Sequence, residues 1–436
     1  MGSTRQTCKR RRRLCGIAAA ACLCQPALAV DLTYTPSTTP AGLSNDVLVS
    51  VAANLALIAN ASWEIGVRAE ALTEWLYPSF SVYGSNPFVN GTPAASPDLV
   101  IDIANTLLAT RPANGTNAES LIPGEGSTAD PASIGVAVLL ANKTSSTPNV
   151  GYADAATGQL NYLLTVAPRA PSGAISHRVE QVQLWSDSVY MSPPFIAYYG
   201  GMTSNVSLLQ QAAQQCQLYY TAMVDETNLF RHVVDGDVTT QDPGHWATGN
   251  AWAAAGMLRV LATIEKTQFS DDLQAERTSL VTMAQTILTA AWQTTSENAT
   301  LNYPDTNASA SARFPDMASS ALFAHATYRL ATLGYDTQDS LVPAAERARV
   351  IVQNNIDSSG YLQNVVNPLN WGQILPSDQH SPEAQAFVLL MNVAWQDWEA
   401  VAMVSNTTTV SPLASAATKT FYAPLALALI SLIALV

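Results

Sequence analysis

The chain has 436 residues, 48% of them hydrophobic, and its 33 acidic against 20 basic residues give a formal net charge of −13 at pH 7. This length is sufficient for one large hydrophobic core or for two domains. The excess of negative charge repels nucleic acid and long polyanions, and no Lys or Arg cluster follows the first residues, so nucleic-acid binding is excluded.

The first 29 residues have the layout of a secretory signal peptide. A basic cluster at residues 9–13 leads into the apolar run 14–23, and a small-x-small cleavage site follows at residues 27–29. The run is too short to span a bilayer comfortably, which favours cleavage over an uncleaved membrane anchor. Cleavage removes six basic residues and no acids, which leaves 14 basic against 33 acidic residues and a net charge of −19.

Four of the five cysteines also lie within the predicted signal peptide, and Cys216 is the one that remains. The processed chain therefore has no internal disulfide, although we expect it to enter an oxidising compartment. The N-x-S/T sequons agree with a secretory route. They stand at Asn60, Asn90, Asn114, Asn142, Asn205, Asn298, Asn307 and Asn406.

Apolar residues recur at three- and four-residue steps through most of the remaining chain, as amphipathic helices require. Helices are predicted over residues 45–61, 97–110, 131–142, 151–167, 206–224, 249–266, 272–292, 316–334, 344–355 and 381–398, with one more after His177. Several begin at Ser, Asp or Pro, which suit helix N-termini. Alternation typical of strands is rare.

About a dozen similar helices without a linker predict an all-α fold of helical hairpins, arranged as a solenoid or a closed ring. The chain has no fixed repeat period, which disfavours a solenoid. We therefore predict a closed α/α barrel over residues 30–405, with loops around one central cavity.

Residues 406–436 combine a small, polar spacer with an apolar run of 16 residues that starts at Phe421. No charged residue follows this run, and it is short for a membrane span. The pattern predicts a removable signal for a glycolipid anchor, with a tail-anchored helix as the alternative. Together with the N-terminal segment and the sequons, it predicts a secreted or cell-surface protein.

The segment HRVEQVQLWSDSVYMSPPF, residues 177–195, gathers aromatic, acidic and proline residues in a chain otherwise rich in Ala, Leu, Ser and Thr. Asp187 stands two residues after Trp185. It has two possible roles. It can cap the helix that follows, or it can be a carboxyl group beside aromatic rings, whose burial favours the protonated form and makes it a proton donor.

A second polar segment covers residues 229–255. Metal binding through His232, Asp235 and Asp237 is one hypothesis, but their spacing matches no recognised metal-binding loop, so no metal or cofactor is predicted. Carbohydrate binding fits better, because Trp rings stack on sugars while Asn, His and Asp bind hydroxyl groups. The candidate aromatic residues are Trp185, Trp246 and Trp252, with packing in the core as the alternative for each.

The stretch VQLWSDSVYMSPPFIAYYG resembles the central motif of the unsaturated glycuronyl and rhamnogalacturonyl hydrolases, glycoside hydrolase families 88 and 105. FRHVVDGD, HWATGNAW, DMASSALFAHATYRLA and SPEAQAFVLLMNVAWQDW follow in the family's order, so the similarity covers roughly residues 45–400. The resemblance implies an (α/α)6 barrel of six helical hairpins. It also implies that an acid protonates the C4=C5 double bond of a terminal unsaturated uronic acid, that water adds at C5, and that the hemiketal opens to release the sugar.

The resemblance also implies roles for residues. Asp187 is the acid, and Asp130, in STADPASIGVAVLL, corresponds to a second acid of the site. The expected substrate-binding residues are His177, Trp185, His232, Trp246, Asn250 and Trp252. The expected substrates are oligosaccharides derived from pectin or glycosaminoglycans.

One position departs from the family pattern. The family commonly has an Arg two residues after the first Trp of HWATGNAW, where this chain has Thr248, and the loss of that cation weakens binding of the uronate carboxylate unless Arg178, Arg231 or His245 replaces it. A catalytically impaired, carbohydrate-binding cell-wall protein on the same barrel is therefore an alternative. Another is a different α/α-barrel glycosidase, such as an endo-mannanase, but the one Asp-Asp pair, residues 271–272, is typical of the start of a polar helix.

Overall fold

The computed structural model describes residues 41–91, 95–111, 117–146, 151–336 and 341–408. The predicted signal peptide, residues 1–29, lies outside the described residues, as does all but the first three residues of the predicted spacer and anchor signal. No helix in the described ranges combines the length and the apolar composition that crossing a membrane requires.

The α-helices are α1 (Asn45–Ile58), α2 (Ser62–Leu76), α3 (Asp98–Ala109), α4 (Asp130–Ser133), α5 (Gly135–Thr144), α6 (Tyr152–Asn161), α7 (Ser188–Met202), α8 (Val206–Met223), α9 (Ala247–Glu265), α10 (Gln274–Trp292), α11 (Met317–Thr332), α12 (Val342–Asn354) and α13 (Pro382–Thr408). Three antiparallel pairs of short strands connect them: β1 (Leu184–Trp185) with β2 (Val233–Val234), β3 (Thr295–Ser296) with β4 (Ala299–Thr300), and β5 (Val366–Asn367) with β6 (Asn370–Ile374).

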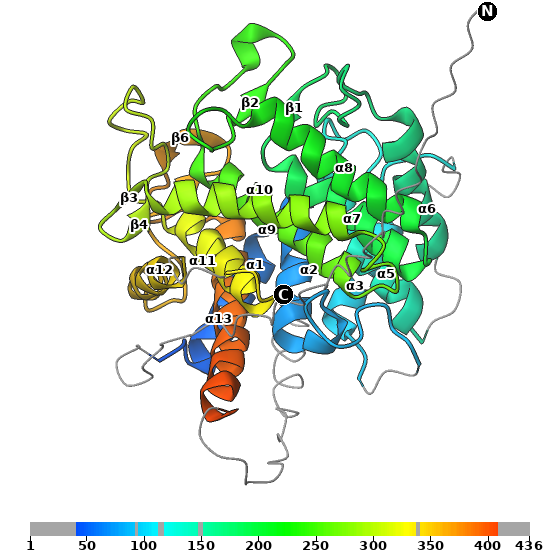
Figure 1. The fold of residues 1–436 in the computed structure, drawn as a ribbon, viewed down its shortest axis with the longest axis horizontal. Coiled ribbons are helices and arrows are strands. Elements are labelled where there is room, and N and C mark those ends of the chain that lie inside the picture. Colours follow the sequence, from blue (N-terminus) through cyan, green and yellow to red (C-terminus); the bar gives the residue numbers. More distant parts are fainter. Residues whose placement is uncertain (1–40, 92–94, 112–116, 147–150, 337–340, 409–436) are drawn as a thin grey trace, which may run out of the picture.

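The helices form two concentric rings. In the inner ring α2, α4, α7, α9, α11 and α13 each contact the next, and α13 contacts α2, which closes the ring. The outer helices pack against it, for example α8 against α7 and α10 against α9, and Figure 1 shows α8 and α10 lying in front of α9. An inner helix and the outer helix that follows it make one hairpin, as in α7–α8, α9–α10 and α11–α12. The predicted (α/α)6 barrel is therefore confirmed.

Small residues allow the inner helices to approach closely. Every residue of α9 from Ala247 to Ile264 is buried. A side chain at Gly256 would place its Cβ 2.2 Å from the backbone oxygen of Val189, so the contact between α9 and α7 requires glycine there. The Ala- and Gly-rich composition seen in the sequence thus serves the closure of the barrel.

The sequence pattern does not predict α2, because charged residues occupy buried positions of this helix. Glu70 and Glu74 occupy core-facing positions of α2, where they interrupt the apolar period. Arg259 of α9 binds both carboxyl groups, with Nη1 2.6 Å from Glu74 Oε1, and Arg329 of α11 places Nη2 2.6 Å from Glu74 Oε2. These ion pairs connect α2 with α9 and α11 across the barrel, and the two partners of each pair lie on different helices.

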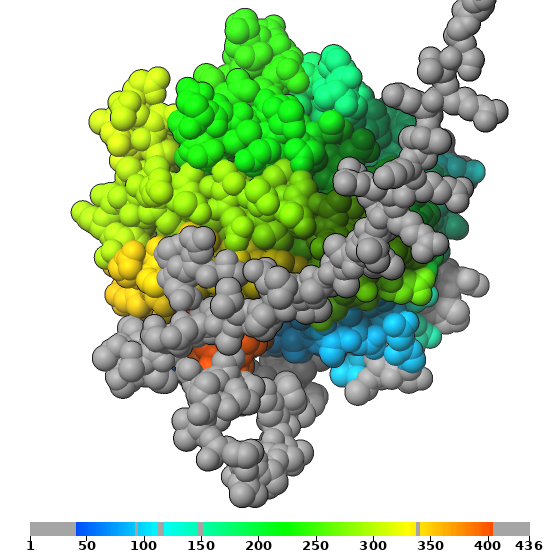
Figure 2. Space-filling view, in the orientation of Figure 1, coloured from blue at the N-terminus to red at the C-terminus, as the bar shows by residue number. Residues whose placement is uncertain are grey.

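The short strands lie at one end of the barrel. Figure 1 shows β1, β2 and β6 along its upper edge, and in Figure 2 the green segments near residues 180–240 form the top of the same face. This end carries the residues that the sequence singles out.

Candidate active site

Backbone pairing brings together segments that are far apart in the sequence. Ser127 forms a bridge with Arg178, and Trp185 on β1 pairs with Val233 on β2. Ser186 N also donates to the carbonyl oxygen of the residue before Val233, at 3.0 Å. The side chains gathered in this way are those of Asp130, His177, Trp185, Asp187 and His232.

The site lies at the N-terminal ends of the inner helices. Asp130 is the first residue of α4, Asp187 immediately precedes α7, and Trp246 immediately precedes α9. Trp63 and Glu383 lie in the first turns of α2 and α13. The N-terminus of a helix carries a partial positive charge, so this end of the ring suits a negatively charged group of a ligand.

His177 has a fixed orientation. Its Nδ1 lies 2.6 Å from Ser188 Oγ, and its ring stacks on the indole of Trp185 with 4.6 Å between ring centroids and 19° between ring planes. Its Nε2 is 3.8 Å from Asp130 Oδ2. Burial lowers the pKa of His177 to about 3, with a contribution from the charge of Arg178, so the imidazole is neutral at ordinary pH.

Asp187 has the properties of a proton donor. It occupies the N-cap position of α7, but its side chain makes no capping hydrogen bond, and its Oδ1 is buried without a partner among the described residues. Burial raises its pKa to about 6, and the charge of His232 opposes that rise. The carboxyl group is therefore left available, with a substantial protonated fraction near neutral pH.

Asp130 is the second acid of the cluster. It is 7% exposed, and Ser127 Oγ accepts a hydrogen bond from its backbone N–H at 3.0 Å. Burial raises the pKa of Asp130 well above its ordinary value, and the negative charges of Asp187 and Glu125 raise it further. The two acids are electrostatically coupled, so ionisation of one disfavours ionisation of the other.

The two ring nitrogens of His232 have different surroundings. Its Nδ1 lies 2.9 Å from Asp242 Oδ2, which also accepts a hydrogen bond from the hydroxyl of Tyr303. Burial would raise the pKa of Asp242, but these hydrogen bonds outweigh burial and lower it, so the group is a carboxylate. Nδ1 is then the donor, and the buried Nε2 lacks a partner within the described ranges.

Aromatic rings surround His232. Trp246 and Trp371 lie 4.6 and 4.3 Å from its ring, centroid to centroid, and Trp185 lies 5.3 Å from Trp371. Trp185 and Trp371 are partly exposed. Trp246 is only 2% exposed and packs behind Trp371. Trp371, on β6, is not among the residues that the sequence singles out, because its contact with Trp185 spans more than 180 positions.

Two predicted substrate-binding residues are not in the pocket. Asn250 is fully buried, with Oδ1 accepting from Phe230 N at 2.7 Å and Nδ2 donating to two backbone carbonyls. Trp252 is 1% exposed and packs against Tyr190 and Phe387. Both stand within α9, past its first residues, where the inner helix enters the core. The prediction that they contact substrate is therefore corrected. Asn250 fixes the backbone of the loop at Phe230, and Trp252 is a core residue.

The position of the family's Arg is closed to substrate. Thr248 is fully buried, and its Oγ1 donates to Asp316 Oδ2 at 3.2 Å. Of the three residues considered as substitutes, Arg231 donates to backbone carbonyls, and His245 is held between two carboxylates at 2.6 and 2.8 Å. Arg178 is one-third exposed at the rim, and its charge lowers the pKa of His177 and opposes the rise of the pKa of Asp130.

A third acid stands near Asp187. Glu383 is 3% exposed, and its Oε1 accepts a hydrogen bond of 2.5 Å from the indole N–H of Trp63. Burial raises the pKa of Glu383 to about 8, and the charges of Glu64 and Asp187 add to this. The sequence signal for these residues is weak, because Trp63 and Glu383 are 320 positions apart.

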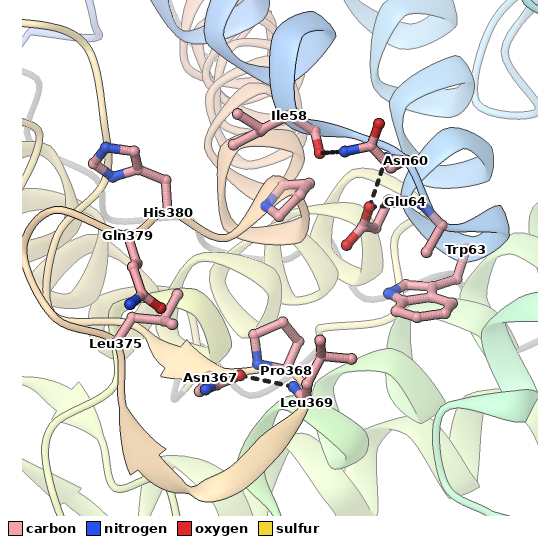
Figure 3. Close-up of a pocket in the computed structure, with 12 residues that line it drawn as sticks. Ile58, Asn60, Trp63, Glu64, Asn367, Pro368, Leu369, Leu375, Gln379 and His380 are labelled. Carbon is pink, nitrogen blue, oxygen red and sulfur yellow. Dashed lines mark hydrogen bonds between the residues drawn. The ribbon is translucent and has the colours of Figure 1, made fainter.

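A pocket of about 440 Å³ opens beside this pair (Figure 3). Its walls come from the start of α2, from the turn between β5 and β6, and from the segment that leads into α13. Trp63 lines it directly. Polar groups such as Gln379 and His380 stand in its lining beside apolar ones such as Leu369 and Leu375, a mixture suited to small polar ligands.

The metal hypothesis finds no support in the described part of the chain, where no group of three or more His, Cys, Asp or Glu is placed to hold an ion. The free Cys216 is buried and does not reach the site.

Comparison with known proteins places this site in a family. Residues 113–366 match the family described as Glycosyl Hydrolase Family 88. The chain belongs to glycosyl hydrolase family 88. The matched range contains Asp130, His177, Asp187 and His232 but ends before Trp371 and Glu383. The resemblance drawn from the motifs is confirmed.

Among curated proteins, the unsaturated rhamnogalacturonyl hydrolase YesR of Bacillus subtilis is 28% identical over 143 residues. That segment is 31% of this family 88 chain and spans 41% of the length of the relative. The two proteins thus share a detectable sequence relationship over less than half of either chain.

Solved structures agree on the fold. A possible member of the GH105 family from Salmonella enterica serovar Paratyphi A superposes with a TM-score of 0.64 at 16% identity, covering 85% of this chain and 98% of that one. The unsaturated glucuronyl hydrolase of Bacillus sp. GL1 gives a TM-score of 0.53 at 13% identity, covering 79% and 93%. At these identities the likeness establishes the barrel.

Proposed function

We propose that this family 88 glycoside hydrolase removes a terminal unsaturated uronic acid from oligosaccharides by acid-catalysed hydration of the C4=C5 double bond. The observation that carries the proposal is Asp187, a carboxyl group with a raised pKa that does not cap its helix and whose buried Oδ1 has no hydrogen-bond partner among the described residues. The substrates are the unsaturated fragments that lyases release from pectin or glycosaminoglycans.

One carboxyl group serves both proton transfers. Protonated Asp187 gives its proton to C4, and positive charge develops at C5, where the ring oxygen shares it. The carboxylate then takes a proton from a water molecule whose oxygen bonds to C5. The resulting hemiketal opens, which leaves a hemiacetal at C1 that releases the leaving sugar. This sequence needs no second carboxylate at the spacing usual for glycosidases.

The neighbouring groups support this role for Asp187. The charge of Asp187 and burial raise the pKa of Asp130, which favours a neutral Asp130 beside Asp187, and the free Nε2 of His232 can bind a substrate hydroxyl. Trp185 and Trp371 supply partly exposed aromatic surface for a sugar ring.

The uronate carboxylate requires a partner other than residue 248. Arg178 at the rim is our candidate, because its charge already acts on Asp130 and His177. The partial positive charges of the inner-helix N-termini add to it.

The test follows the ultraviolet absorbance of the conjugated double bond, with unsaturated galacturonyl-rhamnose and unsaturated glucuronyl disaccharides as substrates. Decay with the wild type and none with Asp187→Asn supports the proposal. Absence of decay on both substrates, from protein shown to be folded, would contradict it.

That negative outcome would favour the second candidate function, a carbohydrate-binding cell-wall protein without activity. The specific observation behind it is Thr248, which is buried and bonded to Asp316 where the family pattern has an Arg. Saccharide binding measured by titration calorimetry with the same disaccharides would then separate a binding protein from an inert barrel.

We also propose that the protein is secreted and carried at the cell surface by a glycolipid anchor. Exposed Asn residues in sequons support glycosylation: Asn60, Asn90, Asn142, Asn205, Asn298 and Asn307. Loss of mass on endoglycosidase treatment and release from cells by a phosphatidylinositol-specific phospholipase test the two parts separately.

A further inference from the structure

The β5–β6 hairpin contributes residues both to the pocket in Figure 3 and to the aromatic cluster around His232. On one strand of this hairpin, Trp371 contacts both Trp185 and His232. The turn of the same hairpin, residues 367–369, forms one wall of the pocket. The hydrogen bond of 2.9 Å from Leu369 N to Asn367 Oδ1 stabilises this turn.

The wall of the pocket formed by Trp63 is also linked to the catalytic cluster. Trp63 lines the pocket, and its indole N–H donates to Glu383, whose pKa is raised in part by the charge of Asp187. Glu383 therefore lies within electrostatic reach of the catalytic acid. We infer that a substrate whose uronyl end lies at Asp187 places its next sugar in this pocket.

The charge inside the pocket comes from Glu64. Its Oε2 accepts hydrogen bonds from the backbone N–H groups of Asn60 and Ala61, at 2.7 and 2.8 Å, which hold the carboxyl group in place. Oε1 takes part in no hydrogen bond among the described residues, and Figure 3 shows it directed toward the interior of the pocket. The pocket lining contains no Lys or Arg that would neutralise this charge.

We propose that Glu64 is a specificity-determining residue, which restricts this pocket to an uncharged leaving sugar and excludes sugars that carry a sulfate or a carboxylate. The inference rests on the proposed hydrolase activity. Its physical basis is repulsion between like charges held a few ångströms apart in a partly desolvated pocket.

The experiment compares two unsaturated glucuronyl disaccharides that differ in one group, a leaving N-acetylhexosamine with and without a sulfate. We expect kcat/KM for the sulfated substrate to be lower by about tenfold or more. Glu64→Gln keeps an oxygen for both backbone hydrogen bonds and removes the charge, so it should bring the ratio of the two kcat/KM values close to one. Asp271→Asn, an exposed carboxylate in the loop between α9 and α10, is the matched control and should leave that ratio unchanged.

The assays use protein without N-glycans, because Asn60 at the pocket edge lies in a sequon, and a pH of about 6, at which a substantial fraction of Asp187 is protonated. Equal kcat/KM values for the two substrates in the wild type, or an unchanged ratio in folded Glu64→Gln, would overturn this inference and leave the proposed function standing.

No hydrolysis of either substrate overturns the proposed function. In that case, calorimetric titration with the free leaving sugars tests the pocket directly: binding of the neutral sugar and not of the sulfated one upholds the charge selection, and equal binding or none refutes it.

Discussion

Asp242 binds Nδ1 of His232 at 2.9 Å, while the opposite, buried ring nitrogen has no partner among the described residues. The low pKa of Asp242 makes its carboxylate a pure acceptor, so the Nδ1 proton is fixed in this hydrogen bond. His232 can then offer Nε2 to a substrate hydroxyl only while Asp242 is in place. The pair assigns Asp242 the role of a positioning residue.

Asp242→Asn should therefore weaken substrate binding without removing the proton donor. The amide can donate to Nδ1, which reverses the tautomer, so that Nε2 carries the proton and no longer accepts a hydrogen bond from a substrate hydroxyl. We expect kcat/KM to fall about tenfold, mostly through KM. Tyr303→Phe, which removes only the second donor to Asp242, is the comparison and should have a smaller effect. An equal loss in both variants would indicate general damage to the loop.

Asp187→Asn should abolish most of the activity, because the amide cannot give a proton to C4. We expect kcat to fall by about 10³-fold, within the range of general acid–base catalysis. Steady-state kinetics measure the loss, and circular dichroism checks the fold. Asp271→Asn provides the matched exposed control, and a similar fall in that variant would show that the loss is not specific to position 187.

The pH profile follows from the raised pKa of Asp187. Burial brings that pKa to about 6, and the acid must be protonated to act, so activity should be retained at low pH and decline as the pH rises through about 6. Measuring kcat/KM from pH 4 to about pH 8 tests this. A profile that instead rises with pH through this window would point to a general base and contradict the assignment.

Arg178→Gln should raise KM for unsaturated uronides with little change in kcat. Loss of one charge-assisted hydrogen bond corresponds to roughly tenfold in binding. Glu180→Gln is the informative partner variant, because Glu180 lies 2.6 Å from the guanidinium of Arg178 and competes for it. In Glu180→Gln, KM should be equal to or lower than the KM of the wild type. An unchanged KM in Arg178→Gln would mean that the helix N-termini alone bind the carboxylate.

Glu383 makes the stability of the fold depend on pH. Its pKa is about 8 in the folded chain and ordinarily near 4.3 in an unfolded one, so the folded state binds the proton more tightly. Its stabilising contribution is complete below about pH 4 and is lost as the pH rises through about 8, a change of a few kcal/mol. Glu383→Gln keeps an acceptor for Trp63 and should lose this dependence. Urea unfolding at pH 5 and pH 8 measures it, and equal pH dependence in wild type and variant would contradict it.

Glu74→Gln should destabilise the barrel strongly. Glu74 is 1% exposed, and both of its carboxyl oxygens bind arginines from α9 and α11 at 2.6 Å. Burial opposes ionisation, but these arginines hold the pKa of Glu74 near 2. Replacing the carboxylate leaves buried charges without compensation, at a cost of about 3–5 kcal/mol. Glu119→Gln, in the partly exposed pair with Arg111, should cost under about 1 kcal/mol in the same urea titration.

Within the candidate site, the predicted residues that the structure brings together are those in short, crowded segments. His177, Trp185 and Asp187 are joined by one turn and the start of one helix, so their proximity follows from chain connectivity. Asn250 and Trp252 looked similar in the sequence, since they share a segment with Trp246. The structure places Asn250 and Trp252 away from the candidate site, because successive turns of α9 run from the rim of the barrel into its core.

The sequence by itself determined the helical periodicity and the barrel class, because both depend on local spacing, and its contiguous motif singled out Asp187 as the candidate acid. The tertiary structure alone decided which groups complete the site. Trp371 reaches Trp185, Glu383 reaches Trp63, and α2 forms around charged residues, only because the closed ring brings the N-termini of its inner helices to one end. Burial then sets the protonation of these acids, and burial is a property of the assembled barrel.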